Sequence, residues 1–357
     1  MTANSSSNKQ SARNQKPRKV TVAGLIIPLL IVLGLVGFTI YQGFNDHDLH
    51  QGYKMMMDTS VELRFSPGSI PVEQLEEEVF AEIDRLEKLF SRSIEGSDVS
   101  KVNEAAGLNH VIVSPEVLHV TEKAVSYAEL TEGSFDPTIA PLVDLWGFYG
   151  QEYRVPNPEE LERIVPFVDY TALEIDRDDE TLFLTQSQMG LELGGIAKGF
   201  IVDQAMGVLK KADVEHAFIN AGGDIGLIGS NPDGEPWRIG ITNPRKTDQI
   251  IAVLSIIDCS VVTSGDYERS FEEEGEKYHH ILDPETGMPA DELASVTIVA
   301  DTTLIADVLS TAVFVLGPQQ GLQLIEDLDE AEGVLITPDL EVLVSSGLKD
   351  KVEIDEQ

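Results

Sequence analysis

Two stretches in the first half of the chain repeat apolar residues at the three- and four-residue spacing of an amphipathic helix. The first covers residues 72–90. The second begins at Ser114-Pro115, where serine can cap a helix and proline suits its first turn, and it ends near Leu130. Ahead of both, residues 55–65 have the composition of an opening strand.

Beyond residue 180, short β-rich runs alternate with helical patterns. The predicted strands cover residues 216–220, 237–242, 250–257, 279–282, 295–300 and 333–336. The predicted helices cover residues 196–210, 303–316 and 319–328, with Gly317-Pro318 closing the second. No repeat or break in composition divides residues 53–350. We therefore expect an α+β fold, a mixed α/β single catalytic unit with room for two lobes.

The N-terminal 41 residues have a different character. Residues 1–20 contain five basic side chains and no acidic one, and residues 21–41 contain no charge. An uncharged run of about 20 residues can span a bilayer as a helix, and preceding positive charge favours a cytoplasmic N-terminus. A cleaved signal peptide is the alternative, but the run is long for one and residues 38–42 lack the small residues of a cleavage site.

These features predict an order of segments along the chain. We expect a basic cytoplasmic tail at 1–20, a transmembrane anchor at 21–41 and a linker at 42–52. The catalytic unit then covers 53–350, and an acidic tail covers 351–357.

The chain is strongly acidic. It has 25 Lys and Arg against 62 Asp and Glu, a formal net charge of −37. Such a surface repels nucleic-acid phosphates, so nucleic acid is excluded as a partner. Salt would screen the self-repulsion, which is compatible with a salty environment. The one cysteine, Cys259, lies in an apolar run and is expected to be a small buried hydrophobe.

Three glycine-containing runs could contact a ligand. Residues 131–138 combine small residues with an aromatic ring and a carboxylate. Residues 193–203 lead paired glycines into a helix beside Lys198, where backbone NH groups can hold phosphate. Residues 220–226 place glycines directly after a strand. Plain turns remain the alternative for all three, and residues 193–203 match neither a Walker A loop nor a dinucleotide fingerprint.

Two further stretches carry candidate chemistry. His279 and His280 would point to opposite faces of a strand, so they are not a matched metal pair, but one of them could act as a base. Asp307 and Thr311 share one face of the predicted helix, and their oxygens suit Mg2+ if a backbone carbonyl and phosphate oxygens complete the set. Local features alone favour a structural histidine and a threonine bonded within its own helix.

Taken in chain order, these stretches resemble the ApbE family of FAD:protein FMN transferases, from about Met57 to Gly347. The blocks that carry the likeness are residues 89–91 with 97–103, 133–146, 193–203, 220–224, 263–269, 280–289 and 295–317. Each block alone is weakly specific, but seven in one order are hard to obtain by chance. The chain departs from many relatives in having Met57-Asp58-Thr59 for Met-Gly-Thr, and it lacks their lipid-bearing cysteine.

The resemblance implies a set of site residues, position by position. The implied Mg2+ ligands are the carbonyl of Ala197 and the side chains of Asp307 and Thr311. The residues implied to contact FAD are Met57, Ser134, Phe135, Asp136 and Asp203, with Lys198 near the pyrophosphate. His280 corresponds to the histidine that deprotonates the acceptor hydroxyl, and Asp307 is the second catalytic position.

The implied reaction is Mg2+-dependent transfer of FMN from FAD to a Thr or Ser hydroxyl, through a phosphoester bond and with release of AMP. The implied partner is an acceptor flavoprotein, such as a subunit of a membrane redox complex. That partner suits a catalytic domain at the cell inner membrane, facing the periplasm or another extracytoplasmic space. An Mg2+-dependent FAD pyrophosphatase and a non-catalytic flavin carrier are the rival interpretations.

Overall fold

The structure is a computed structural model that describes residues 49–149 and 152–355. The basic tail and the anchor predicted at 21–41 lie outside the described residues. The helices are α2 Val72–Phe90, α3 Asp98–Glu104, α4 Pro115–Leu130, α5 Ala140–Trp146, α6 Pro158–Ile164, α7 Ala197–Lys211 and α8 Thr303–Asp327, with short 3-10 turns at Val165–Phe167, Tyr170–Ala172 and Ser346–Leu348.

The strands are more numerous than the sequence predicts, and several have different bounds. They are β1 His50–Met56, β2 Thr59–Phe65, β3 Val111–Ile112, β4 Leu173–Asp176, β5 Thr181–Leu184, β6 Ala217–Ala221, β7 Asp224–Ile228, β8 Trp237–Asn243, β9 Lys246–Ile256, β10 Ser260–Gly265, β11 Ser270–Glu273, β12 Glu276–His279, β13 Ser295–Ala300, β14 Ala331–Ile336, β15 Val342–Val344 and β16 Val352–Ile354.

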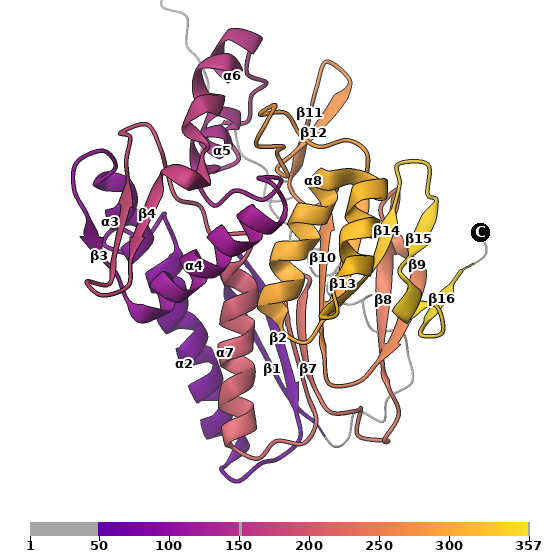
Figure 1. The fold of residues 1–357 in the computed structure, drawn as a ribbon. Helices are drawn as coiled ribbons and strands as arrows, with labels where there is room; N and C mark the ends of the chain where they lie inside the picture. Colours follow the sequence, from indigo (N-terminus) through magenta and orange to yellow (C-terminus); the bar gives the residue numbers. More distant parts are fainter. Residues whose placement is uncertain (1–48, 150–151, 356–357) are drawn as a thin grey trace, which may run out of the picture. The chain divides into compact units, whose positions relative to one another are not determined.

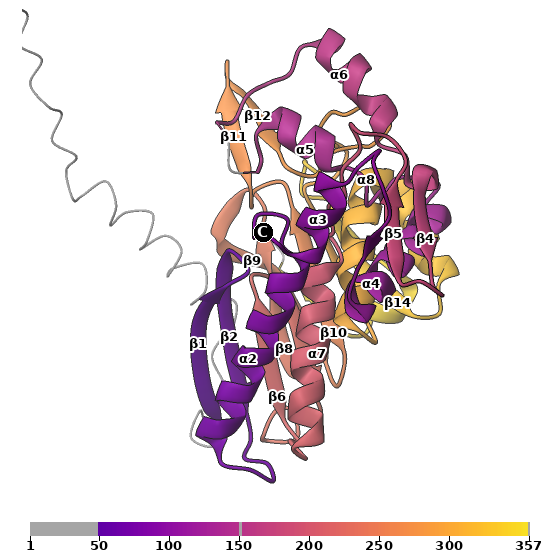
Figure 2. The ribbon, with the colours of Figure 1, turned by 90° about the vertical axis from the view of Figure 1, so that its left-hand side faces the viewer.

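The main sheet has eight strands in the order β1-β2-β6-β7-β10-β13-β14-β15, and every neighbouring pair is antiparallel. Figures 1 and 2 show α2 and α7 running side by side along this sheet, and α7 contacts α8 in turn. A fully antiparallel sheet with long helices on it is an α+β arrangement. The expected mixed α/β fold class is therefore confirmed.

Alternate residues of the sheet strands enter two different cores, because successive side chains point to opposite faces. Val262 and Val296 belong to the large core that includes α2, α7 and α8. Val261 and Val299 belong to a second core with the small sheet β16-β9-β8. The main sheet is thus buried on both faces, as the middle of three layers.

The helix α8 carries the kink that the sequence predicts at Gly317-Pro318. Gly317 has φ 76° and ψ −179°, which breaks the helical path inside α8. Within the described part of the chain, α8 alone is long and apolar enough to cross a membrane, but half of its apolar window is buried in the protein. It packs against β10, β13 and β14, so we assign it as a core helix.

Several predicted boundaries are wrong. Residues 55–65 form a hairpin and not one strand, because Met57 and Asp58 take φ of 52° and 57° and turn the chain. The strand predicted at 279–282 ends at His279. The predicted linker 42–52 contains the start of β1, and the predicted tail 351–357 contains β16, which pairs with β9.

A third, smaller core supports the β11–β12 hairpin. Trp146 is fully buried there, its indole donates a hydrogen bond to the carbonyl of Gly287 at 2.8 Å, and Tyr278 of β12 packs against its ring. Phe271 of β11 stacks on Tyr153 with ring centroids 5.1 Å apart. These aromatic contacts fix the hairpin that leads into His280.

Candidate active site

Two turns meet at one end of the main sheet. The turn at Met57 and Asp58 joins β1 to β2, and its Met57 NH donates to Glu87 of α2 at 3.0 Å. The turn at Gly222 and Gly223 joins β6 to β7. A Cβ at Gly222 would lie 2.3 Å from Thr59 Oγ1, so only glycine permits this contact. Met57, an expected FAD contact, therefore lies beside the glycine turn.

The residue after that turn, Asp224, is paired with the second residue of α7. Lys198 Nζ donates to Asp224 Oδ1 at 2.5 Å. The main-chain NH of Gly199 donates to Asp307 Oδ2 at 2.8 Å. A Cβ at Gly199 would lie 2.3 Å from the carbonyl oxygen of Thr303, so the two helices approach closely here. This contact brings Asp307 of α8 next to Asp224 of β7.

The group formed by Lys198, Asp224 and Asp307 combines two buried carboxyl groups with a partly exposed ammonium group. Burial raises the pKa of Asp224, although Lys198 opposes the shift. Burial and the neighbouring Asp224 raise the pKa of Asp307. Burial alone would lower the pKa of Lys198, but Asp224, Asp307 and Glu268 outweigh it and raise that pKa. Lys198 is therefore held as a cation.

The expected magnesium ligands come from two helix segments that touch. Thr311 lies one turn after Asp307 on α8, and its Oγ1 would be 3.3 Å from a Cβ at Gly195. Ala197 follows as the first residue of α7. The structure thus brings Ala197, Asp307 and Thr311 to one junction.

The donor chemistry at this junction fits Mg2+. Nowhere in residues 49–149 and 152–355 do three His, Cys, Asp or Glu side chains gather as a metal centre. The expected set needs only one carboxylate, because a carbonyl and a hydroxyl supply the other protein oxygens. Asp224 Oδ2 is buried near Asp307 and has no hydrogen-bond partner within the described residues, so it is a candidate oxygen for a cation.

The loop that follows α4 is organised by its own carboxylate. Asp136 Oδ1 accepts from the NH of Thr138 at 2.7 Å and from its hydroxyl at 2.6 Å, while Oδ2 accepts from the NH of Tyr170 at 3.0 Å. Phe135 is buried and would be 3.2 Å from a Cβ at Gly195. Ser134 is partly exposed. The structure therefore places Phe135 at the glycine turn before α7 and uses Asp136 to shape the loop.

Asp203 has a comparable structural task. Its Oδ1 accepts from the NH of Thr303 at 2.8 Å and its Oδ2 from the NH of Leu304 at 2.9 Å. These are among the NH groups that an α-helix leaves unpaired at its start. Asp203 thus caps α8 from α7, and this contact holds the two helices together near Asp307.

His280 follows the last residue of β12. Its NH donates to the carbonyl of Arg269 at 3.1 Å. Its Nδ1 is buried and has no hydrogen-bond partner among the residues that the structure describes. Burial lowers the pKa of His280 to about 3, with further lowering from the positive charges of Arg269 and Lys198. The imidazole is therefore neutral at pH 7.

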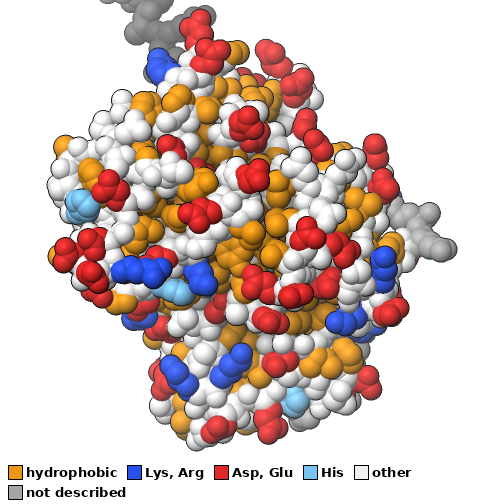
Figure 3. All heavy atoms as spheres, in the orientation of Figure 1, with side chains coloured by type: hydrophobic (Ala, Val, Ile, Leu, Met, Phe, Trp, Pro, Cys, Tyr) orange, Lys and Arg blue, Asp and Glu red, His pale blue; other side chains and the backbone are white. Residues whose placement is uncertain are grey.

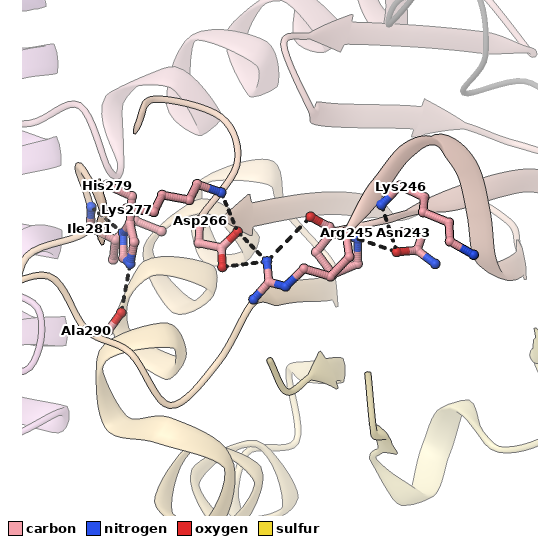
Figure 4. Close-up of polar contacts among 9 residues, drawn as sticks. Asn243, Arg245, Lys246, Asp266, Lys277, His279, Ile281 and Ala290 are labelled. Carbon is pink, nitrogen blue, oxygen red and sulfur yellow. Dashed lines mark hydrogen bonds and ion pairs between the residues drawn. The ribbon is translucent and has the colours of Figure 1, made fainter. Parts of the chain in front are cut away.

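His279 differs from its neighbour. Its Nε2 is 2.8 Å from the carbonyl oxygen of Ala290, its Nδ1 accepts from the NH of Ile281 at 3.3 Å, and its ring packs edge-on against Phe314. Figure 4 shows these contacts between His279 and the segment after it. His279 is a structural residue, so the two histidines have separate roles.

An ion-pair cluster anchors the hairpin that presents His280 (Figure 4). Arg245 Nη1, from the β8–β9 turn, donates to both carboxylate oxygens of Asp266 at 2.9 and 2.8 Å. Lys277 Nζ of β12 donates to Asp266 Oδ1 at 3.3 Å. Asn243 accepts the NH groups of Arg245 and Lys246, which closes the turn.

No site role was predicted for Asp224, Arg92, Arg245 or Lys277. Asp224 closes the Asn-Ala-Gly-Gly-Asp run, where its place after paired glycines was a signal. Arg92 lies over the ring of Tyr149, with 4.0 Å between the guanidinium carbon and the ring centroid, and its Nε is 3.1 Å from Glu192 Oε2. Glu192 Oε1 accepts from the NH of Gly194 at 2.8 Å. Arg92 therefore helps to set the glycine turn before α7.

Glu268 stands at the open side of the Lys198 group. Its Oε1 would be 4.0 Å from a Cβ at Gly223. Its side chain is solvent-exposed, yet protein surrounds it closely enough that desolvation, with a contribution from Asp224, raises its pKa to about 7. Glu268 lies in the block 263–269 that carries the family resemblance, but no role was predicted for it.

Comparison with known proteins supplies an independent view of this arrangement. The ApbE family model matches residues 57–335. The FAD:protein FMN transferase of Treponema pallidum (strain Nichols) is 34% identical over 293 residues, covering 78% of this chain and 81% of that protein. The FAD:protein FMN transferase of Klebsiella pneumoniae (strain 342) is 35% identical over 278 residues, covering 77% and 85%.

Solved structures agree with these matches. The ApbE protein of Thermotoga maritima superposes with a TM-score of 0.81 at 34% identity, over 85% of this chain and 99% of that one. The flavin transferase ApbE of Vibrio cholerae superposes with a TM-score of 0.77 at 29% identity, over the same shares.

Proposed function

The chain belongs to the ApbE family and is an FAD:protein FMN transferase, and we propose that it joins the FMN half of FAD to a Thr or Ser hydroxyl of an acceptor flavoprotein. We propose Mg2+ as its cofactor and AMP as the second product. The observation that carries this proposal is the junction where Asp307 and Thr311 of α8 meet the Gly195–Ala197 turn at the start of α7.

The proposed reaction replaces the phosphoanhydride bond of FAD with a phosphoester bond to the acceptor. The acceptor hydroxyl oxygen forms a bond to the phosphorus of the FMN half, and the bond from that phosphorus to the bridging oxygen breaks. AMP leaves with the bridging oxygen, and the hydroxyl proton passes to a base. When bound, Mg2+ would withdraw negative charge from the pyrophosphate and stabilise the leaving AMP.

The chain's own residues supply binding and proton transfer. Ala197, Asp307 and Thr311 would hold the Mg2+, and the NH groups at the start of α7 together with Lys198 would attract the pyrophosphate. Phe135 would lie beside the flavin side of the substrate, at the turn it contacts through Gly195. The other predicted FAD contacts are Met57, Ser134, Asp136 and Asp203. The two aspartates already accept hydrogen bonds from backbone NH groups, so they would contact FAD while keeping those bonds.

His280 is the proposed base. Its lowered pKa of about 3 keeps the imidazole neutral at pH 7, so it has a lone pair for the hydroxyl proton. The negative charge of a bound pyrophosphate would raise that pKa, because a nearby anion favours the protonated imidazole. The base would therefore strengthen when the substrate is in place.

Intact mass spectrometry of the acceptor tests the proposal. The protein is incubated with FAD, Mg2+ and a flavoprotein domain that carries an acceptor Thr. We expect a mass gain of one FMN less one water, abolished by EDTA, by Asp307→Ala in the enzyme and by Thr→Ala in the acceptor. If the acceptor stays unmodified and FAD stays intact although the enzyme is folded, the proposed transferase activity is refuted.

The location is a separate proposal. We propose that residues 21–41 anchor the chain in the inner membrane and that the catalytic unit lies on the extracytoplasmic side, since residues 1–20 are basic and residues 21–41 are uncharged. Protease added to spheroplasts should remove a C-terminal tag, and alkaline carbonate should leave the protein in the membrane fraction. A protected tag or a soluble protein would contradict this location.

A further inference from the structure

Three charged side chains meet where α7, β7 and α8 come together, and their charges do not balance. Lys198 offers one positive charge, whereas Asp224 and Asp307 offer two carboxylates. The side chain of Asp224 is 1% exposed, and Asp307 is also buried. Burying two carboxylates against one ammonium group leaves one negative charge uncompensated, so a proton or a second positive charge is expected nearby.

The two oxygens of Asp224 are used differently. Oδ1 accepts the short hydrogen bond from Lys198 Nζ at 2.5 Å. Within residues 49–149 and 152–355, Oδ2 is buried and has no hydrogen-bond partner. The carboxyl group of Asp307 lies close enough to Asp224 for the two groups to interact. Two neighbouring carboxyl groups repel each other when both are ionised, so they are stabilised by a shared proton or by a cation between them.

The neighbours of Asp307 provide further oxygen atoms at this junction. Its Oδ2 is occupied by the NH of Gly199, which fixes the carboxylate against the start of α7. Thr311 presents its hydroxyl at Gly195 from the same helix face. A hard cation between Asp307 and Thr311 would have oxygen donors on the α8 side and Asp224 on the sheet side.

We infer that Asp224 supplies a further oxygen, through Oδ2, to the cation held by Ala197, Asp307 and Thr311, while Lys198 fixes its other oxygen. This inference rests on the proposed function, because it concerns the Mg2+ site proposed there. It assigns a metal-site role to a residue of β7, so the sheet as well as the two helices positions the ion.

The competing account gives Asp224 only the task of holding Lys198. The two accounts differ in what removal of Lys198 does. If Asp224 contacts the cation, Lys198→Met keeps the carboxylate and removes a competing charge, so metal affinity is kept or increased. If Asp224 acts only through Lys198, then Lys198→Met and Asp224→Asn weaken metal binding alike.

The test is a titration of the full-length protein with Mn2+ in the presence of FAD, with free Mn2+ read from its electron paramagnetic resonance signal. Asp224→Asn and Asp307→Asn preserve shape and should each weaken Mn2+ binding by about 10- to 100-fold, the range typical when a metal site loses a supporting partner. Glu268→Gln is the matched control, because it also removes a carboxylate near Lys198. It should change the affinity by less than about threefold, because Glu268 is only partly ionised near pH 7 and is not among the proposed ligands.

The outcomes separate the claims. If Asp307→Asn weakens Mn2+ binding and Asp224→Asn does not, the role of Asp224 is refuted and the proposed function stands. Equal losses for Asp224→Asn and Glu268→Gln, or for Asp224→Asn and Lys198→Met, also refute it. If wild type binds no Mn2+, both this inference and the Mg2+ part of the proposed function fail. If Lys198→Met does not fold, the comparison of Mn2+ affinity between Asp224→Asn and Glu268→Gln still tests the role of Asp224.

Discussion

The carboxyl groups around the site differ in what satisfies their oxygens. Asp136 and Asp203 use both oxygens to accept backbone NH groups, which shapes a loop in one case and caps α8 in the other. Within the described part of the chain, Asp224 leaves one oxygen without a hydrogen bond. Asp307 accepts one backbone NH at Oδ2, beside a lysine and a second carboxylate. The free oxygen of Asp224 is therefore the one available to the proposed cation.

The buried state of His280 predicts a pH dependence of stability. Its folded pKa of about 3 lies below the ordinary value of 6.5, so the unfolded state binds more protons between those values. The free energy of unfolding should therefore fall as pH falls from about 6.5 towards 3. Between pH 7 and pH 5 the loss from this residue is about 2 kcal/mol.

Chemical denaturation of wild type and His280→Gln at pH 7 and pH 5 checks this expectation. The variant has no imidazole to protonate, so it should lose less stability than wild type over the same interval. His279 remains in both proteins and cancels from the difference. Parallel pH curves for the two proteins would contradict the buried, neutral state assigned to His280.

At the scale of elements, the approach of α7 to α8 positions the site. Gly199 is the point of contact, because a Cβ there would lie 2.3 Å from the carbonyl oxygen of Thr303 and 2.7 Å from Asp307 Cβ. Backbone atoms cannot move aside as a flexible side chain can. The separation of the two helices thus depends on the absence of one methyl group.

A matched pair of substitutions in α7 tests this packing. Gly199→Ala should destabilise the protein by about 1 to 3 kcal/mol, the usual cost of overpacking, and should also impair FMN transfer. Gly207→Ala, also in α7, has nothing within 4 Å of the new Cβ and should stabilise by about 0.5 to 1 kcal/mol. Thermal denaturation measures both. Similar shifts in the two variants would show that the helices are not in close contact at Gly199.

The hairpin β11–β12 gives a second prediction at this scale. Arg245→Gln removes the strongest anchor of Asp266 and should let the hairpin that leads into His280 shift. Because small misplacement of a catalytic group costs about 10- to 100-fold in rate, kcat should fall in that range while the KM for FAD stays within about threefold.

Arg238→Gln is the control for Arg245→Gln. Arg238 lies on β8 and pairs with Glu353 on the exposed side of the small sheet. An exposed ion pair contributes about 1 kcal/mol or less, so this variant should keep wild-type kcat. Equal kcat losses in the two variants would argue against a positioning role for the Arg245–Asp266 cluster.

The elements show which sequence patterns carry structural information. The helices at Val72–Phe90 and Pro115–Leu130 match their predicted limits, because long amphipathic periods and a Ser-Pro start are local signals. The β1–β2 turn was missed because Met57 and Asp58 lack the glycine or asparagine that usually marks positive φ. Strands β7 and β10 were not predicted. β7 is buried at every residue and begins directly after the paired glycines that were assigned to a turn, and in β10 only Thr263 and Ser264 are partly exposed.

The candidate site could be predicted only in part from the sequence, because several of its contacts join distant segments. The resemblance selected residues by position, and the structure brings Ala197, Asp307 and Thr311 together as expected. The pairing of Lys198 with Asp224, and of Arg245 with Asp266, joins segments more than twenty residues apart. Such contacts depend on the register of the sheet and have no periodic signal along the chain.

At the scale of the whole molecule, the net charge of −37 is the dominant feature. Figure 3 shows acidic side chains spread over the visible face, with Lys and Arg less frequent. Mutual repulsion of like charges destabilises a compact state, and salt screens it.

Screening predicts a salt dependence of stability. The melting temperature should rise as NaCl increases from about 0.01 M to 0.2 M, where the Debye length falls from about 30 Å to below 10 Å. At these NaCl concentrations salt acts mainly by screening charges, whereas effects on protein hydration need higher concentrations. Differential scanning fluorimetry measures the shift, and a melting temperature that stays constant or falls would contradict a destabilising surface charge.

The stoichiometry of the products tests the central claim most directly. Enzyme, FAD, Mg2+ and acceptor are mixed, and AMP, free FMN and acceptor-bound FMN are quantified in the same sample. The account predicts one acceptor-bound FMN for each AMP, with little free FMN, and loss of both products in Asp307→Asn. AMP matched by free FMN on an unmodified acceptor would contradict it and identify the chain as an FAD pyrophosphatase.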